Sequence, residues 1–483
     1  MAGATIPQRQ AIITGMATGT SLSNAFPLGS RLNERGRLEV GGCDTVELAK
    51  EFGTPAYVVA EDDLRSRARA FMQAGAEAHG DFQTVFASKA FPCTAVLEVF
   101  AEEGLFCDVA SGGELHLALN AGFAAERIVM HGNAKSLTEL RSALDARVGL
   151  IVVDNFDELD RLERLTSGEN ARVDAVRSAH VPTDGAAHVR PREVPHAAPP
   201  NAAHAPHSPQ PVLIRVTPDV RGETHEKIST GQADSKFGFS TADLPAAIER
   251  IAGIDGLALK GLHAHIGSQL LDLEPFRREV AEIAKLGSES HPPGGFSVWD
   301  LGGGLGVAYT EQQASPPAIE DYVGTLVSAA HEHGMGGSGQ RLLIEPGRAL
   351  TANAGVTLYT VESVKRNVST WVAVDGGMSD NLRPMLYNAP YEAHVADRFG
   401  GAMPCVLAGK HCESGDVIVR DALLDDPRPG DVIVTPATGA YGFAMASNYN
   451  GVPRPPVVFC REGNARVVVR RESFDDLISR DVR

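Results

Sequence analysis

Short apolar runs alternate with amphipathic stretches between about residue 55 and residue 350. This alternation constrains the fold more than any other feature, because a strand that is apolar on both faces must be covered on both sides, as in a parallel sheet. One helical pattern spans residues 112–122, where Leu115, Ala118 and Leu119 form a stripe and Gly122 supplies a stop. Eight runs predict buried strands: 84–87, 105–110, 128–131, 150–154, 212–216, 259–265, 297–301 and 341–345.

Eight strand–helix units predict a (β/α)8 barrel of the TIM type over residues 46–350. A doubly wound open sheet is the structural alternative, and periodicity alone does not separate the two. A chain of 483 residues is also too long for one ordinary core, so a second domain is expected.

After residue 355 the pattern of apolar and polar residues changes, and few long helical patterns remain. Runs such as WVAVDGG, CVLAG, DVIVTPAT, PVVFC and ARVVVRRES are separated by turn residues, which is typical of antiparallel β structure. We therefore expect a second domain, a β-sandwich or β-barrel-like unit, built from residues 351–483 together with the N-terminal segment 1–45.

One segment, residues 166–211, fits neither domain because it is rich in Ala, Pro and His. Its spaced histidines suggest metal binding, but no carboxylate or cysteine cluster completes a site. We expect a disordered insertion in the barrel domain, and no metal site.

Composition excludes several classes of function. A net charge of −17 argues against a nucleic-acid or anionic-membrane surface. The six cysteines are scattered without a CxxC pair, as expected for reduced thiols. No apolar run approaches the roughly 18 residues that a membrane helix needs, and the first 30 residues lack a secretory signal pattern. We expect a cytoplasmic protein.

Lys89 follows the first predicted strand by two residues, within TVFASKAF. Barrels carry their catalytic groups at this C-terminal rim, and a buried lysine there can form an imine with an aldehyde cofactor. An ordinary surface lysine is the alternative, although the apolar neighbours weaken it.

Two further motifs follow the last two predicted strands. DLGGGLG, at 300–306, offers glycine N–H groups where barrels commonly bind phosphate, or is only a tight turn. EPGR, at 345–348, places a carboxylate where it could hold a proton on a heterocyclic nitrogen and an arginine where it could clamp a substrate carboxylate. The alternative is a turn with an ion pair.

HAHIGSQ, at 263–269, puts two histidines on one face of a strand, either as a metal pair or as a ring against a planar cofactor. HCESGD, at 411–416, puts a thiol beside a carboxylate in the β domain, where an ordinary hairpin is the alternative.

These motifs, in order and spacing, resemble the fold-type-III pyridoxal phosphate-dependent decarboxylases, and among them the diaminopimelate decarboxylases. The resemblance runs from FGTPAYVV at 52–59 to the C-terminus, apart from the insertion. Its segments are FASKAF, DVASGGEL, SKFGF, HIGSQ, DLGGGLG, EPGR, DGGMSDNLRPMLY, GKHCESGD and ATGAY.

The resemblance implies roles for these residues. Lys89 would hold pyridoxal 5'-phosphate, His265 would stack on its ring, and Glu345 would pair with the ring nitrogen. The phosphate would lie against Ser268, Gly302, Gly303, Gly304, Gly347 and Arg348. The substrate's distal end would be held by Arg348, Arg383 and Tyr387, with Tyr441 lining the cofactor and substrate pocket. Cys412 and Glu413 would come from the neighbouring subunit of a homodimer.

The reaction that the resemblance implies is decarboxylation of meso-2,6-diaminopimelate to L-lysine through a pyridoxal phosphate aldimine, the last step of lysine biosynthesis. The catalytic residues would be Lys89, Glu345, His265 and Cys412, and either Lys89 or Cys412 would return the proton to carbon. A decarboxylase for another basic amino acid is the nearest alternative. A related racemase would usually carry arginine at position 345, and a non-catalytic protein would be expected to have lost Lys89 or the Cys412–Glu413 pair.

Overall fold

The computed structural model describes residues 22–167, 208–218, 235–290, 292 and 294–482. A closed barrel of eight parallel strands lies at its centre, and its strands follow one another around the barrel in chain order. They are β5 (Phe82–Ala87), β6 (Phe106–Val109), β7 (Ile128–Met130), β8 (Leu150–Val153), β9 (Gln210–Arg215), β10 (Leu257–His263), β11 (Val298–Asp300) and β12 (Arg341–Ile344). The eight predicted strands and the (β/α)8 barrel are confirmed, and the open sheet is excluded.

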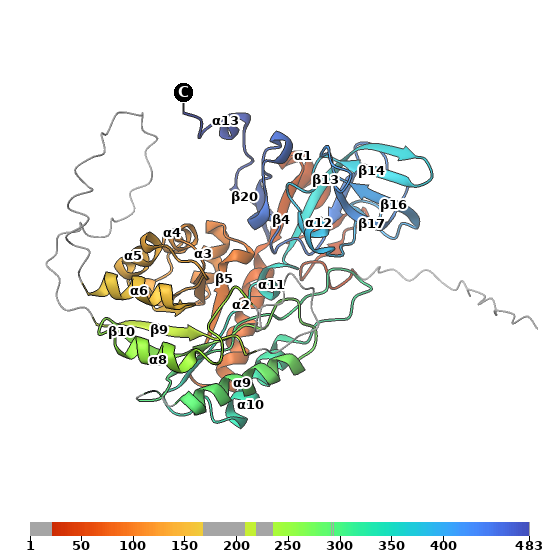
Figure 1. Cartoon of the computed structure of the whole chain (residues 1–483). Helices are drawn as coiled ribbons and strands as arrows, with labels where there is room; N and C mark the ends of the chain where they lie inside the picture. Colours follow the sequence, from red (N-terminus) through yellow and green to blue (C-terminus); the bar gives the residue numbers. More distant parts are fainter. Residues whose placement is uncertain (1–21, 168–207, 219–234, 291, 293, 483) are drawn as a thin grey trace, which may run out of the picture.

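Helices surround the barrel (Figure 1). They are α2 (Glu61–Ala78), α3 (Thr94–Glu102), α4 (Gly112–Asn120), α5 (Leu137–Ala146), α6 (Phe156–Thr166), α8 (Leu244–Ala252), α9 (Glu274–Ser290), α10 (Ile319–Glu332) and the short α11 (Arg348–Thr351). Side-chain caps mark the beginning of some of these helices; for example, α5 begins with a capping box between Ser136 and Glu139. In α4, Leu115 and Ala118 are buried, but Leu119 is 38% exposed, so its predicted place in the buried stripe is wrong.

A second domain lies on one side of the barrel and is built on a branched nine-stranded sheet (Figure 1). Its strands are β4 (Ala56–Ala60), β13 (Gly355–Arg366), β14 (Thr370–Val374), β15 (His394–Val395), β16 (Met403–Ala408), β17 (Val417–Leu424), β18 (Val432–Thr435), β19 (Val457–Arg461) and β20 (Asn464–Val469). Its short helices are α12 (Arg383–Tyr387) and α13 (Phe474–Leu477). Most neighbouring strands are antiparallel, as predicted, but the pairs β14–β16 and β19–β4 are parallel.

The N-terminal segment packs on this second domain. It contributes a small sheet of β1 (Arg31–Leu32), β2 (Leu38–Val40) and β3 (Cys43–Asp44), followed by α1 (Thr45–Phe52). Leu38, Val40 and Cys43 share a buried cluster with residues of β4, β13 and β19. Because β4 pairs with β13 and β19, the boundary predicted at residue 45 wrongly assigns this strand to the barrel.

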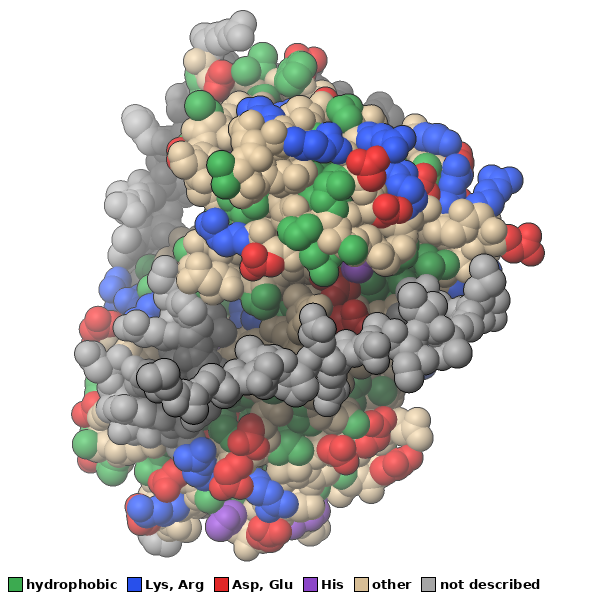
Figure 2. Space-filling view, turned by 90° about the vertical axis from the view of Figure 1, so that its right-hand side faces the viewer, with side chains coloured by type: hydrophobic (Ala, Val, Ile, Leu, Met, Phe, Trp, Pro, Cys, Tyr) green, Lys and Arg blue, Asp and Glu red, His purple; other side chains and the backbone are tan. Residues whose placement is uncertain are grey.

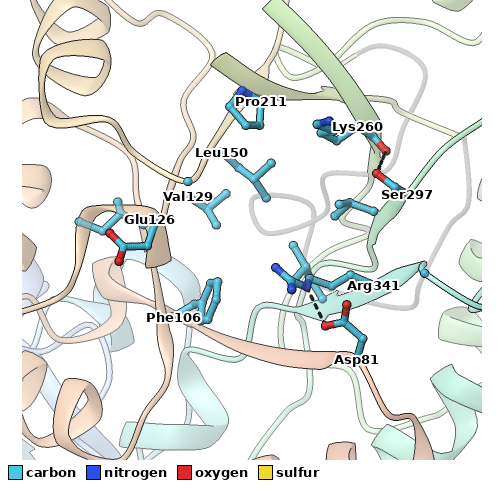
Figure 3. Close-up of a pocket in the computed structure, with 14 residues that line it drawn as sticks. Asp81, Phe106, Glu126, Val129, Leu150, Pro211, Lys260, Ser297 and Arg341 are labelled. Atoms are coloured by element: carbon cyan, nitrogen blue, oxygen red, sulfur yellow. Dashed lines mark hydrogen bonds and ion pairs between the residues drawn. The ribbon is translucent and has the colours of Figure 1, made fainter. Parts of the chain in front are cut away.

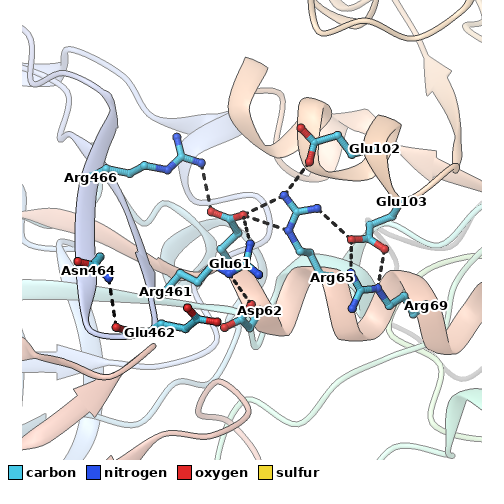
Figure 4. A network of polar contacts seen from close by, with 10 residues as sticks. All are labelled: Glu61, Asp62, Arg65, Arg69, Glu102, Glu103, Arg461, Glu462, Asn464 and Arg466. Carbon is cyan, nitrogen blue, oxygen red and sulfur yellow. Dashed lines mark hydrogen bonds and ion pairs between the residues drawn. The ribbon is translucent and has the colours of Figure 1, made fainter.

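A network of charged side chains joins the two domains (Figure 4). Glu61, the first residue of α2, is almost fully buried and pairs with Arg65 of the same helix. It also pairs with Arg461 at the end of β19 and with Arg466 of β20. This single carboxylate therefore connects the helix layer of the barrel to the C-terminal strands.

On the face shown in Figure 2, basic and acidic side chains are intermixed over the upper part of the molecule. Oppositely charged side chains of the β domain also form ion pairs, such as Arg366–Asp426 and Arg398–Asp431. No helix within the described residues is long and apolar enough to cross a membrane. Most of the predicted insertion, residues 168–207, lies outside the described part; its two ends belong to α6 and β9.

Candidate active site

The predicted site residues of the barrel gather at the C-terminal ends of its strands, as barrel enzymes require. Lys89 lies in a 3-10 turn directly after β5, and its Nζ atom lies 2.6 Å from Oδ2 of Asp108 on β6. The Lys89 side chain keeps 48% of its accessible surface, whereas Asp108 is buried. The Lys89 amine is thus fixed by Asp108, while part of its side chain remains accessible.

Glu345 follows β12 and is buried between two imidazoles. Its Oε1 lies 2.5 Å from Nε2 of His131, at the end of β7, and its Oε2 lies 3.2 Å from Nε2 of His263, the last residue of β10. Burial opposes ionisation of Glu345, but the two imidazoles hold its pKa well below the usual range. Oε1 has no well-aligned hydrogen-bond donor among the described residues. An ionised carboxylate is the partner that a protonated ring nitrogen needs.

The two histidines of HAHIGSQ serve different partners. His263 faces Glu345, whereas His265 lies beyond the strand and accepts a hydrogen bond from the Gly303 N–H through Nδ1, at 3.2 Å. Burial lowers the pKa of His265 to about 3, so the ring is neutral. His131, His263, Asp300 and Glu345 also bring ligand atoms within 4.8 Å of one another. Burial and Glu345 raise the pKa of Asp300 well above its usual range.

The glycine triplet is required mainly for close packing. A Cβ on Gly302 would lie 2.4 Å from the Ala264 carbonyl oxygen, and one on Gly303 would lie 2.1 Å from that of Glu345. The Gly302 N–H already donates to Asp300, and the Gly303 N–H to His265. The expectation that all three glycines present free N–H groups to a phosphate is therefore wrong for these two.

Arg348 and Arg383 converge from the two domains. Arg348, the first residue of α11, donates from Nη2 to Oγ of Ser268 at 2.9 Å and from Nη1 to the Tyr309 hydroxyl. Arg383, the first residue of α12, donates to the Tyr391 hydroxyl at 2.5 Å. Both side chains are buried. Neither forms an ion pair with an Asp or Glu among the residues described by the structure.

Tyr441 ties the β domain to the loop that carries Lys89. Its N–H donates to the Ala90 carbonyl oxygen at 2.8 Å, and its backbone has a φ of +62°, which is uncommon for a residue other than glycine. The Arg348 guanidinium lies over its ring, 4.9 Å from the centroid. Gly347 lies immediately before Arg348, and Tyr387 ends α12, near Arg383 in the sequence.

Cys412 and Glu413 lie on an exposed loop between β16 and β17. The Cys412 N–H donates to Asn450, and Glu413 accepts a hydrogen bond from the Tyr449 hydroxyl. Among the described contacts, neither reaches Lys89 or Glu345 of the same chain.

A cavity of about 310 Å³ lies at the opposite end of the barrel (Figure 3). Asp81, Phe106 and Arg341 line it at or beside the starts of their strands, and Lys260 also faces it. It holds none of the predicted site residues. The candidate active site therefore lies at the C-terminal end of the barrel, with Lys89, Glu345, Arg348 and Arg383.

Comparison with known proteins decides the family. Residues 61–187 and 200–352 match the family described as "Pyridoxal-dependent decarboxylase, pyridoxal binding domain". The diaminopimelate decarboxylase of Bacillus subtilis (strain 168) is 42% identical over 463 residues, which cover 94% of this chain and 97% of that protein. This chain belongs to the diaminopimelate decarboxylase family of pyridoxal-dependent decarboxylases.

Other members agree with this assignment. The diaminopimelate decarboxylase of Mycobacterium tuberculosis (strain H37Rv) is 41% identical over 484 residues, covering 95% and 98% of the two chains. The crystal structure of that of M. jannaschii with L-lysine superposes with a TM-score of 0.82 at 29% identity, covering 95% of this chain and 99% of the other. A lysine/ornithine decarboxylase of Vibrio vulnificus, at 23% identity and a TM-score of 0.67, shares the fold. Family membership makes the chain a pyridoxal phosphate-dependent lyase.

Several residues of this site were not found from the sequence. Asp108 contacts Lys89, His131 contacts Glu345, and Tyr309 contacts Arg348. Asp108 lies in the second half of the predicted strand 105–110, which was a usable signal for the rim of the barrel. Tyr309 and Tyr391 lie in irregular segments whose local pattern carries no such signal.

Proposed function

We propose that this chain removes one carboxyl group from meso-2,6-diaminopimelate to give L-lysine and carbon dioxide, the last step of lysine biosynthesis. The observation that carries the proposal is the pair Arg348 and Arg383, two buried cations bonded to hydroxyl oxygens and to no described carboxylate. A buried charge without a counter-charge costs several kcal/mol, roughly, which a bound anion would offset. The substrate therefore brings a carboxylate to these residues.

Pyridoxal 5'-phosphate fits the same mouth of the barrel. Lys89 offers an amine open to an aldehyde, and Glu345 offers a buried, ionised carboxylate to a ring nitrogen. When bound, the cofactor supplies an electron sink that accepts the electron pair left by the departing carboxyl group. His265 would cover one face of the ring. Phosphate contacts are assigned to Ser268, Gly304, Gly347 and Arg348, and Tyr441 is assigned to the cofactor and substrate pocket.

The chain's own groups then divide the work. Glu345 keeps a proton on the ring nitrogen because an adjacent anion favours the protonated form. Asp108 orients the Lys89 amine and balances its positive charge. Lys89 or Cys412 returns a proton to the carbon that has lost its carboxyl group. Arg348, Arg383 and Tyr387 hold the distal end of the substrate, and Tyr441 lines the pocket.

We further propose a homodimer with shared active sites. Cys412 and Glu413 are exposed and make no described contact with the Lys89 side of their own chain. In a dimer, Glu413 would pair with the distal ammonium of the substrate in the neighbouring subunit, and Cys412 would reach its reacting carbon.

We also assign the chain to the cytoplasm, with a small-molecule substrate and no nucleic-acid or membrane partner. The net charge of −17 and six unpaired cysteines support this assignment.

Substrate discrimination tests the proposal. The purified holoenzyme is offered meso-diaminopimelate, lysine, ornithine and arginine separately, and carbon dioxide release is measured. We expect release from diaminopimelate alone, because a substrate without a distal carboxylate leaves the two arginines unpaired. Release from ornithine or lysine without release from diaminopimelate would overturn the specificity and favour the alternative basic amino-acid decarboxylase.

A lysine substitution tests the cofactor attachment. Lys89→Ala should abolish the imine absorbance of the holoenzyme, whereas Lys260→Ala, at the opposite end of the barrel (Figure 3), should keep it. An intact imine band in Lys89→Ala would refute the role of Lys89.

A further inference from the structure

Tyr309 lies between the two arginines of the site. It belongs to the irregular segment between β11 and α10 and is fully buried. Its hydroxyl accepts a hydrogen bond from Nη1 of Arg348, while the guanidinium of Arg383 lies over its ring, 4.6 Å from the centroid. One side chain therefore contacts both cations, through its oxygen and through its ring face.

Tyr391 repeats this arrangement on the side of the β domain. Its hydroxyl accepts a hydrogen bond from Nη1 of Arg383 at 2.5 Å. Its ring meets the ring of Tyr309 edge to face, with centroids 5.2 Å apart and planes at 71°. The two phenols thus form one packed unit that reaches from the barrel to the β domain and bonds one arginine at each end.

The charges explain why such a unit is needed. Two guanidinium groups held in one buried place repel each other, and no described carboxylate separates them. Aromatic faces and phenol oxygens are the groups that remain to stabilise them. Burial opposes ionisation of Tyr309, but Arg348 and Arg383 lower the pKa of its hydroxyl. Burial raises the pKa of Tyr391 to about 12, against the effect of Arg383, so Tyr391 stays neutral.

We propose that Tyr309 and Tyr391 are positioning residues that hold Arg348 and Arg383 at the spacing needed to grip one carboxylate, and so determine the selectivity for substrates with a distal carboxylate. The inference rests on the proposed function, because it concerns how the two arginines recognise the distal end of the substrate. Neither tyrosine needs to touch the reacting atoms.

Phenylalanine substitutions separate positioning from packing. Tyr309→Phe and Tyr391→Phe keep the rings and remove only the hydroxyl acceptors. Tyr322→Phe is the matched control, because Tyr322 is equally buried and its hydroxyl has no hydrogen-bond partner among the described residues. For each variant, kcat and KM are measured with meso-diaminopimelate. Binding of L-lysine, which keeps one carboxylate, and of cadaverine, which has none, is followed by the cofactor absorbance.

We expect KM for diaminopimelate to rise about tenfold in each active-site variant, since each loses a hydrogen bond to a charged group, with kcat changed less than about threefold. L-Lysine should bind about tenfold more weakly, cadaverine should bind within about twofold of the wild type, and Tyr322→Phe should match the wild type throughout.

Two outcomes would overturn the inference. The first is that both phenylalanine variants keep KM and lysine binding within about twofold of the wild type. The second is that lysine and cadaverine binding weaken equally, which would show a packing role without selectivity. If the wild-type enzyme itself fails to decarboxylate diaminopimelate, the proposed function fails instead, so the two failures are distinguishable.

Discussion

The Nζ atom of Lys89 lies 2.6 Å from Oδ2 of Asp108, a carboxylate buried at the end of the next barrel strand. Partial burial lowers the pKa of the Lys89 amine, but Asp108 raises it, and the balance is a pKa above the ordinary value. Beside the Asp108 carboxylate, the Lys89 amine is therefore protonated at neutral pH.

Asp108→Asn should make Lys89 a neutral amine at lower pH. The substitution removes the main influence that raises the pKa of Lys89, so this pKa falls. The measurement is the rate at which the apoenzyme forms its imine with pyridoxal phosphate as a function of pH. The midpoint of that profile should move to lower pH than in the wild type. An unmoved midpoint would show that Asp108 does not set the charge of Lys89.

His263 should make the apoprotein less stable in acid. Burial lowers its pKa to about 4, whereas the unfolded chain has a value of about 6.5. Between these values the unfolded state binds the extra proton, so stability falls as pH decreases from 6.5 to 4, by at most about 3 kcal/mol. His263→Asn should flatten this dependence in urea unfolding. An equal slope in both proteins would contradict the prediction.

Glu61→Gln should weaken the connection between the domains. The substitution removes the ion pairs that Glu61 forms with Arg65, Arg461 and Arg466 (Figure 4). Because the last two arginines are half exposed, we expect a loss of about 2 kcal/mol in unfolding free energy. Glu462→Gln, an exposed neighbour, is the control and should stay within about 0.5 kcal/mol of the wild type.

Two inactive variants should restore activity to each other if sites are shared between subunits. Lys89→Ala and Cys412→Ala each remove a residue that the proposed dimer takes from opposite chains. Mixed dimers then contain one intact site, and equal mixing should recover about a quarter of wild-type activity. The assay is carbon dioxide release after subunit exchange. Failure to recover any activity, with mixed dimers demonstrated, would place Lys89 and Cys412 of one site on the same chain.

The barrel could be predicted because its signals are local. Each of the eight strands is a short, mainly apolar run, and most of its residues are buried as in a parallel strand covered by helices. Lys89, Glu345 and Arg348 were located because they follow such runs directly. The domain boundary could not be located in this way, because the five residues of β4 are buried like those of a barrel strand although they pair with β13 and β19.

The tertiary structure alone decided which distant side chains meet. Tyr309, Tyr391, Arg348 and Arg383 come from four segments and form one unit, and no pattern within any of those segments specifies that meeting. Likewise, Glu345 has its charge set by His131 and His263 from two other strands. By itself, the sequence determined the strand order of apolar runs and the residues at their ends, since hydrophobic periodicity is a property of neighbours along the chain. Closure of the barrel and docking of the β domain decided the electrostatics, because charge interactions depend on distance in space and on burial.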